Sequence, residues 1–238
     1  MIHLRAFRAI DEKENCYRYA TGHQRVLEGF NLANISTNNV SWADNPNVYV
    51  VMALDSKTDD VLGGIRIQIA DGRVPLPVED AVSHFDPKVH EMVEHYALNG
   101  GTSELCGLWN SRSLAPNAGI TLNLVVAGMA LCNQLPITSI FTIVASYTLK
   151  IARRMGFQIE TELGNNGEFV YPNSNYIARV LSMNPLTLEH TYNIFRDQIN
   201  ELRENPFLEK TVEIPSGDNI VYSHDLVISN VGKIIYEI

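Results

Sequence analysis

Glu104 and Arg66 are charged side chains within runs that are otherwise apolar, so each could carry chemistry. Glu104 enters the run TSELCGLWN, and a carboxyl group that enters a buried strand without a partner has a raised pKa, which suits a general base. Arg66 lies between Ile65 and Ile67, and the alternation of side chains along a strand places it on the face opposite to these two isoleucines. There it would be a partner for the Glu104 carboxylate or for a substrate carboxylate. The alternative for each residue is an exposed or salt-bridged position at the rim of a sheet.

A polar loop, SRSLAPNAG (111–119), runs directly into an apolar helical pattern. Backbone N–H groups at the start of a helix bind phosphate, so the loop predicts a site for a co-substrate that carries phosphates. The residues predicted to hold it are Leu108, Trp109, Asn110, Arg112, Asn117, Ala118 and Gly119. The alternative is a plain connection between strand and helix that carries a surface arginine.

Trp42 is the one large aromatic side chain in a segment rich in asparagine and serine, residues 31–47, which predicts a mobile loop. This tryptophan would either close a substrate pocket or cap the core.

The histidines and cysteines show no spacing typical of a metal site, so we predict no metal. Cys106 and Cys132 fall in apolar stretches and are expected to be buried thiols. The cysteine count of 3 is odd and no CxxC motif occurs, which indicates a reducing compartment. Because the N-terminus also lacks a signal-peptide pattern, we predict a cytoplasmic protein.

Hydrophobic periodicity predicts strands and helices in alternation, with a proline-rich interruption at 73–85. Strands are expected at 2–8, 47–54, 61–70, 103–109, 137–145, 158–163 and 176–182, with further β-structure in 208–238, and helices at 11–30, 87–98, 118–135, 146–155 and 186–204. Helices between strands, with both hairpin and crossover connections, predict an α/β (or α+β) fold with a mixed central sheet and helices on both faces.

The chain divides, on this reading, into a core domain at 1–183 and a C-terminal extension at 184–238. The extension begins with a polar amphipathic helix and continues as β-structure, which we expect to pack on the core. It could serve as a docking or dimer element, so a homodimer is one expectation.

The composition excludes some partners. The formal net charge is −9, from 18 lysines and arginines against 27 aspartates and glutamates, and such a chain repels nucleic acid. No apolar stretch approaches the ~20 residues of a membrane-spanning helix, so no span is expected. A local basic pocket for one anionic co-substrate remains compatible with this charge.

The order strand, loop, helix, strand and helix in 102–157, closed by Gly156-Phe157, resembles the GNAT acyltransferases. These enzymes move an acyl group from a pantetheine thioester to an amine. The resemblance implies that Tyr147 is a candidate acid for the leaving thiolate and part of the substrate pocket. The chain departs from the GNAT pattern at two points. The phosphate-binding loop matches only at Gly119. Ala152 occupies the position of the usual tyrosine, so Tyr147 lies one helical turn before that position.

A second resemblance is to the acyl-homoserine-lactone synthases, a GNAT-like family of autoinducer synthases. The matching residues are Gly63 and Arg66 in GGIR, Leu76-Pro77, Phe85-Asp86 and Glu104. It implies that Glu104 is the base or positions it, that Arg66 orients the acceptor or pairs with Glu104, and that Phe85 belongs to the substrate pocket. Cys106-Gly107 stands where Ser-Arg is expected, which puts S-adenosylmethionine in doubt as the acceptor.

These resemblances imply N-acyl transfer from acyl-CoA or an acylated acyl-carrier protein to a small-molecule amine. One alternative is a non-catalytic protein of the same fold that binds a ligand or docks a partner. Another is an unrelated α/β enzyme. A GNAT fold requires the parallel strands at 103–109 and 137–145 to splay apart, so that pantetheine lies between them, whereas an unrelated fold predicts no such opening.

Overall fold

A computed structural model of the chain describes residues 1–29, 40–214, 217–231 and 236–237. The strands are β1 (Ile2–Arg8), β2 (Val48–Asp55), β3 (Val61–Ile69), β4 (Thr102–Asn110), β5 (Ser139–Ala145), β6 (Gln158–Ile159), β7 (Glu168–Val170), β8 (Ile177–Met183), β9 (Glu209–Glu213) and β10 (Asn219–Asp225). The α-helices are α1 (Lys13–Glu28), α2 (Pro77–Val82), α3 (Lys88–Leu98), α4 (Ile120–Leu131), α5 (Leu149–Arg154) and α6 (Asn193–Glu204).

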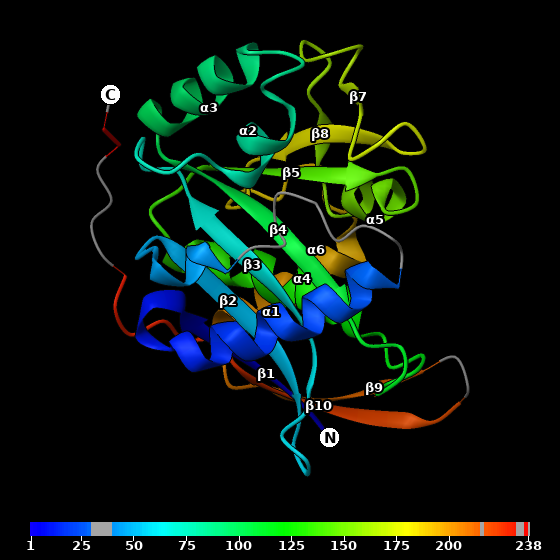
Figure 1. The fold of residues 1–238 in the computed structure, drawn as a ribbon. Coiled ribbons are helices and arrows are strands. Elements are labelled where there is room, and N and C mark those ends of the chain that lie inside the picture. Colours follow the sequence, from blue (N-terminus) through cyan, green and yellow to red (C-terminus); the bar gives the residue numbers. More distant parts are fainter. Residues whose placement is uncertain (30–39, 215–216, 232–235, 238) are drawn as a thin grey trace.

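The strands form one mixed sheet, in the order β6-β8-β5-β4-β3-β2-β1-β10-β9, with β7 pairing to β8 outside this path. Neighbours from β1 to β4 run antiparallel, and so do β5 and β8. The parallel neighbours are β4 with β5 and β1 with β10. Helices cover both faces of this sheet, as predicted (Figure 1).

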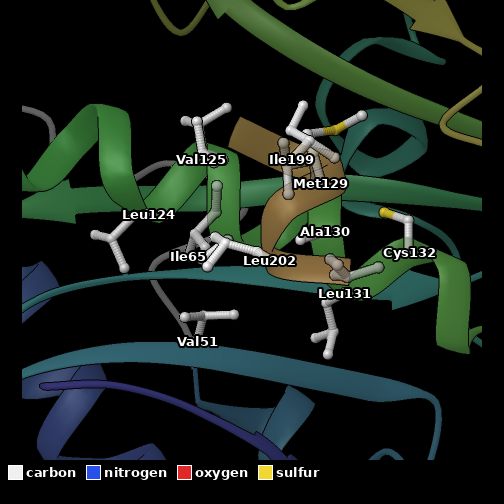
Figure 2. Close-up of a cluster of buried hydrophobic side chains, with 14 of the residues drawn as sticks. Val51, Ile65, Leu124, Val125, Met129, Ala130, Leu131, Cys132, Ile199 and Leu202 are labelled. Atoms are coloured by element: carbon white, nitrogen blue, oxygen red, sulfur yellow. The ribbon is translucent and has the colours of Figure 1, made fainter. Parts of the chain in front are cut away.

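Helix α4 lies behind the middle of the sheet, between its strands and α6 (Figure 2). Its sequence, ITLNLVVAGMAL, is apolar around almost its whole circumference, which suits a helix with neighbours on both sides. Val51 and Ile65 reach it from the sheet, while Ile199 and Leu202 reach it from α6. Gly128 sits over the sheet, where an added Cβ would approach Leu105 to 3.2 Å. These apolar contacts hold α4 against the middle strands of the sheet, β3 and β4 among them.

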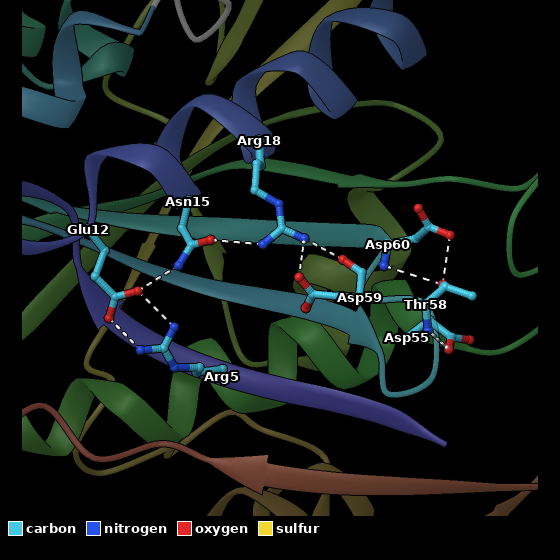
Figure 3. A network of polar contacts seen from close by, with 8 residues as sticks. All are labelled: Arg5, Glu12, Asn15, Arg18, Asp55, Thr58, Asp59 and Asp60. Atoms are coloured by element: carbon cyan, nitrogen blue, oxygen red, sulfur yellow. Dashed lines mark hydrogen bonds and ion pairs between the residues drawn. The ribbon is translucent and has the colours of Figure 1, made fainter.

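Helix α1 covers the opposite face, and polar contacts fix its first turns (Figure 3). Arg5 of β1 forms two hydrogen bonds with the Glu12 carboxylate, at 2.7 and 2.6 Å. Asn15 donates to Glu12, and Arg18 donates to Asn15 and pairs with Asp59 in the β2–β3 turn at 2.9 Å. Partly exposed pairs of this kind stabilise little individually. Together they join α1 to two connections of the sheet and set its direction across β3 and β4.

The segment after residue 183 extends this sheet and covers α4. Strand β10 adds to the free edge of β1, and β9 completes a hairpin with it. The buried Tyr222 hydroxyl of β10 donates to the Ala118 carbonyl at 2.5 Å, just before α4 begins. The C-terminal extension is therefore in contact with the core, while the division at residue 183 into separate domains stays a prediction.

Several predicted boundaries differ from the structure. The helix predicted at 186–204 begins only at Asn193, because the Asn184 side chain accepts from the amides of Leu186 and Thr187 and holds that stretch in a turn. The predicted strand at 158–163 ends at Ile159, where turns begin.

Two elements were not predicted, and two predictions fall mainly on residues outside the description. Helix α2 forms within the proline-rich interruption, because Pro77 occupies its first position, where no amide is needed. Strand β7 is the other addition. The β-structure expected in 208–238 was to end with KIIYEI (233–238), of which only 236–237 are described, and they are not in a strand. Of the mobile loop expected at 31–47, residues 31–39 lie outside the described part, and the remainder contains a 3-10 helix at Ser41–Asp44 in which Trp42 is buried.

Candidate active site

Strands β4 and β5 pair at their beginnings and then separate. The parallel ladder joins Thr102 with Ser139, Ser103 with Ile140 and Glu104 with Phe141, and it ends there. Beyond this point β4 continues to Asn110 and β5 to Ala145, and the two diverge (Figure 1). The opening required by the predicted fold is present, and the alternative of an unrelated fold without it is wrong.

A bulge in β4 lies beside this opening. Gly64 pairs with Trp109 and Arg66 with Cys106, so two residues of β4, Gly107 and Leu108, face one residue of β3. A bulge bends its strand, which turns β4 away from β5. Gly107 has a φ of 61°, and a Cβ there would lie 2.7 Å from the Tyr19 hydroxyl, so glycine fits this position best. Tyr19 of α1 donates a hydrogen bond to the Gly107 carbonyl and holds the bulge.

A cavity of about 240 Å³ occupies the opening. Its walls come from both strands, from α1 and α4 on the two faces of the sheet, and from α5 and the segments at 171–178. The residues relevant below are His23, Glu104, Cys106, Gly107, Leu108, Thr142, Ala145 and Tyr147. The cavity thus connects the α4 side of the sheet with the α1 side, through the gap between the strands.

Glu104 lines this cavity and is fully buried, with 0% of its surface exposed. One carboxylate oxygen, Oε2, accepts from the Val78 amide at 2.6 Å, at the beginning of α2. The other, Oε1, has no hydrogen-bond partner among the described residues. Burial raises the pKa of Glu104 to about 8, although the Val78 amide and the positive charge of Arg66 act in the opposite direction. A carboxyl group that titrates near neutral pH can both accept and return a proton.

Arg66 lies on the same face of the sheet as Glu104, one strand away. It is 2% exposed, and its guanidinium carbon is 4.3 Å from the centre of the Trp42 ring, a cation–π contact. No carboxylate in the described part of the chain lies within ion-pair distance of it. Sequence reasoning thus placed the two residues together, but the structure shows no direct ion pair between them.

His23 is a cavity residue that sequence reasoning missed. Tyr19, His23 and Leu27 follow at intervals of four in α1, so they share the face that meets β4. The His23 side chain is 4% exposed and contacts the Tyr19 ring edge-on, at 6.1 Å between centroids. Burial, and next the charge of Arg66, lower the pKa of His23 to about 4, so the imidazole is neutral at pH 7. The helical interval was the available signal, but a lone histidine on an apolar face does not identify a site.

The residues predicted to hold the phosphate-bearing co-substrate lie in different surroundings. Leu108 lines the cavity, whereas Trp109 packs under α1, 5.8 Å from Tyr19 between ring centres. Asn110 accepts from the Thr121 hydroxyl at 3.0 Å and so joins the end of β4 to the first turn of α4.

The loop itself is mostly exposed. Arg112 and Asn117 are exposed, Ala118 is buried, and Gly119 precedes α4 with a φ of 72°. The N–H groups of the first turn of α4 follow this glycine, as the predicted phosphate site requires.

Of the predicted pocket residues, Tyr147 is at the cavity and is 71% exposed. Trp42 lies outside its walls, under Arg66 and 5.4 Å from Tyr19 between ring centres. Phe85 is 53% exposed and stacks on His84, at 3.9 Å between centroids, on the α2–α3 side.

Cys106 and Cys132 are free and buried, as predicted, and Cys16 is free and buried as well. Burial raises the pKa of the Cys106 thiol to about 12, so this cavity residue stays protonated and is a poor nucleophile. Among the described residues, no three histidine, cysteine, aspartate or glutamate side chains gather to form a metal site. Every helix in the described ranges is too short or too polar to cross a bilayer.

Comparison with known proteins finds similarity in structure. No family model matches the sequence, and a search of curated proteins found no match. FeeM, an N-acyl amino acid synthase from uncultured soil microbes, aligns with a TM-score of 0.58 at 14% identity, over 83% of this chain and 98% of that one.

Two further solved structures have the same architecture. BjaI, a CoA-dependent acyl-homoserine lactone synthase, aligns with a TM-score of 0.53 at 16% identity, over 84% of this chain and 90% of that one. An acyl-CoA N-acyltransferase from Pseudomonas aeruginosa aligns with a TM-score of 0.52 at 14% identity, over 76% and 99%. At these identities the likeness shows the fold: the chain has the GNAT fold, as its sequence predicted.

Proposed function

We propose that this protein is an N-acyltransferase that moves an acyl group from acyl-CoA to the nitrogen of a small-molecule amine. The observation that carries the proposal is the cavity between the separated strands β4 and β5, with the titratable carboxyl group of Glu104 in its wall. The fold shared with acyl-CoA-dependent enzymes supports the same activity.

The unpaired edges of β4 and β5 fit the pantetheine arm of the donor. Past Glu104 and Phe141 the Thr142 hydroxyl still donates to the Leu105 carbonyl at 2.9 Å, but the two strands form no further ladder. The backbone groups beyond this contact can therefore pair with the amides of an inserted chain. The amides that follow Gly119 at the start of α4, with Arg112 nearby in sequence, would hold the phosphates. An acylated carrier protein presents the same pantetheine arm and is the alternative donor.

Glu104 supplies the proton transfer in this proposal. The amine nitrogen attacks the thioester carbon, a C–N bond forms, and one N–H proton passes to the Glu104 carboxylate. The C–S bond then breaks, and the proton returns to the thiolate, which leaves as a thiol. The products are an amide and a free thiol, and Glu104 regains its starting state. Backbone N–H groups near the β4 bulge are candidates for stabilising the negative oxygen of the intermediate.

The proposed function is tested by a binding and product screen of the purified protein. The probes are acetyl-CoA, medium- and long-chain acyl-CoAs and an acylated carrier protein, each with and without a mixture of amino acids and S-adenosylmethionine. A donor that binds the folded state is expected to raise the melting temperature, because binding adds to the free energy of unfolding. Mass spectrometry is expected to find an N-acylated product with at least one donor and amine.

The outcomes of this screen distinguish the proposed acyl-CoA-dependent enzyme from its alternatives. A shift with a donor but no product with any amine would favour a non-catalytic binding protein of the same fold. No shift with any donor would contradict the proposal. A product formed only from the carrier-protein donor would replace acyl-CoA and leave the reaction class intact.

A further inference from the structure

Charge is distributed unevenly along this chain. Between Glu104 and Glu160 the sequence contains no aspartate or glutamate, although the whole chain has 27. The cations in the same stretch are Arg112, Lys150, Arg153 and Arg154. Three of these four belong to helix α5, so a protein that is acidic as a whole has a basic surface at this helix.

The three cations of α5 are available to a partner. Lys150, Arg153 and Arg154 are exposed, and within the described ranges none of them forms an ion pair with a carboxylate. Helix α5 lies beside the end of β5 (Figure 1), and Thr148 and Ile151 line the cavity between the strands. The basic surface therefore adjoins the rim of this cavity.

Exposed apolar side chains lie next to these cations. Tyr147 is 71% exposed, Val170 50% and Ile177 37%. The Ser146 hydroxyl donates to the Ile177 carbonyl at 3.3 Å and accepts from Arg179 at 3.0 Å, which joins the segment before α5 to the beginning of β8. Val170 pairs with Ile177 across β7 and β8, so their side chains lie on the same face of the sheet. Arg179 shares that face by alternation, so it is the face on which α5 lies.

An anionic lipid surface matches this combination of side chains. Tyrosine and aliphatic side chains lie favourably at the level of the lipid headgroups, while lysine and arginine attract anionic lipids. The net charge of −9 opposes the approach of such a surface. However, charges more than about 8 Å away are largely screened at 0.15 M salt, so the local cations decide once contact is made.

We propose that this surface binds an anionic lipid bilayer, with its apolar side chains at the level of the headgroups. This membrane patch consists of Tyr147, Lys150, Arg153, Arg154, Val170 and Ile177. The inference goes beyond the proposed function, because it assigns an interaction surface rather than a reaction. Tyr147 belongs both to the membrane patch and to the cavity rim, so an acyl chain that partitions into lipid would enter or leave the cavity next to the bilayer.

Vesicle flotation of the purified chain, without any acyl donor, tests the membrane patch. The probes are vesicles of phosphatidylcholine alone and of phosphatidylcholine with about 30 mol% phosphatidylglycerol, at about 0.15 M salt. The chain is expected to bind the anionic vesicles about 10-fold or more tightly than the neutral ones. Lys150→Glu is expected to weaken this binding about 5-fold or more, because a cation near the surface is lost. Ile177→Ser is expected to weaken it about 5-fold, because an apolar side chain no longer leaves water.

The matched controls are Lys57→Glu and Phe207→Ser. Both residues are exposed and lie outside the membrane patch, and Lys57→Glu changes the net charge as Lys150→Glu does. Both controls are expected to bind the anionic vesicles as the wild-type protein does. Melting temperatures check that each variant is folded.

Tyr147→Trp separates insertion from electrostatic attraction alone. Its fluorescence is expected to shift to shorter wavelength with anionic vesicles, because the exposed indole leaves water, whereas the native Trp42 and Trp109 are already buried. Binding without this shift would contradict the insertion of apolar side chains and so overturn the inference.

Two other outcomes would also overturn it. One is the absence of vesicle binding, or equal binding by Lys150→Glu and Lys57→Glu. The other is Lys150-dependent binding of a soluble acidic protein, such as an acyl-carrier protein, without vesicle binding, which would replace the membrane by that partner. Because these measurements contain no acyl donor, their failure leaves the proposed acyl transfer untouched, and the failure of acyl transfer leaves them untouched.

Discussion

A Glu104→Gln variant is expected to acylate amines about 100 to 10,000 times more slowly than the wild-type protein, the range that a positioned general base contributes. Glutamine has the same shape and can still accept from the Val78 amide, but it cannot take a proton. The wild-type rate under limiting donor and amine is expected to rise with pH up to about 8, where Glu104 titrates. Steady-state kinetics of thiol release across pH 6 to 9.5, in both proteins, checks this.

The same variant is expected to be more stable than the wild-type protein at high pH. The pKa of Glu104 rises from 4.5 to about 8 on folding, so the unfolded chain loses a proton that the folded protein keeps within this window. The contribution of the protonated Glu104 carboxyl group to the free energy of unfolding is fully present below pH 4.5. It is lost as the pH rises through 8, by at most about 1.4 kcal/mol per pH unit. Arg66, Glu79 and Asp80 are the charges that modulate it. Denaturant unfolding at pH 5 and pH 9 measures the difference.

Glu79→Gln is the matched control. Glu79 is also buried, but it accepts from the Leu76 amide and pairs with His90 at 2.7 Å, away from the cavity. Its replacement is expected to lower stability and, because it removes a nearby negative charge, to lower the pKa of Glu104. The maximal rate of the folded protein at high pH is expected to stay close to that of the wild type. A Glu104→Gln variant with wild-type turnover would remove Glu104 from the mechanism. One that loses stability at pH 9 would show that the carboxylate is stabilising there.

Ala145→Trp is expected to weaken acyl-CoA binding by about 100-fold or more, or about 2.7 kcal/mol. Ala145 ends β5 and lines the cavity, so an indole there would occupy much of a volume of about 240 Å³. Because the residue is only partly buried, the added ring can enter the opening without displacing the core. Calorimetric titration with a nonreactive acyl-CoA analogue measures the loss.

Leu98→Trp is the control for this substitution, because Leu98 is exposed at the end of α3 and does not line the cavity. It is expected to bind the analogue as the wild-type protein does. Equal affinity in Ala145→Trp would place the donor elsewhere on the molecule.

The fold could be predicted largely because its central elements have strong local patterns. Residues 140–145 are apolar except for Thr142, as a strand covered on both faces requires, and the hairpin at 47–70 has two runs typical of strands around a polar turn. The start of α6 and the presence of α2 could not be predicted from local pattern. Helix α6 begins late because Asn184 bonds to the backbone. Helix α2 is a short helix in a proline-rich stretch, and the contact that joins it to the sheet, in which Glu104 accepts from the Val78 amide, is long-range.

The site was less predictable than the fold, for a physical reason. Glu104 stood out because a charge within an apolar strand is unusual, and its burial and raised pKa agree with that interpretation. His23 did not stand out, because its position in the cavity wall depends on how α1 lies across β4, which long-range contacts set. The bulge at Gly107 was hidden for the same reason, since a glycine in a strand indicates a bulge only once its partner strand is known.

Hydrogen exchange of β4 and β5 tests the central claim most directly. The wild-type protein is compared with and without an acyl-CoA analogue in which a methylene group replaces the thioester sulfur. The account predicts that amides in 105–110 and 142–145 that face the gap gain protection, because the inserted pantetheine arm pairs with them. Bound analogue with no change in these amides, and with protection elsewhere, would contradict it.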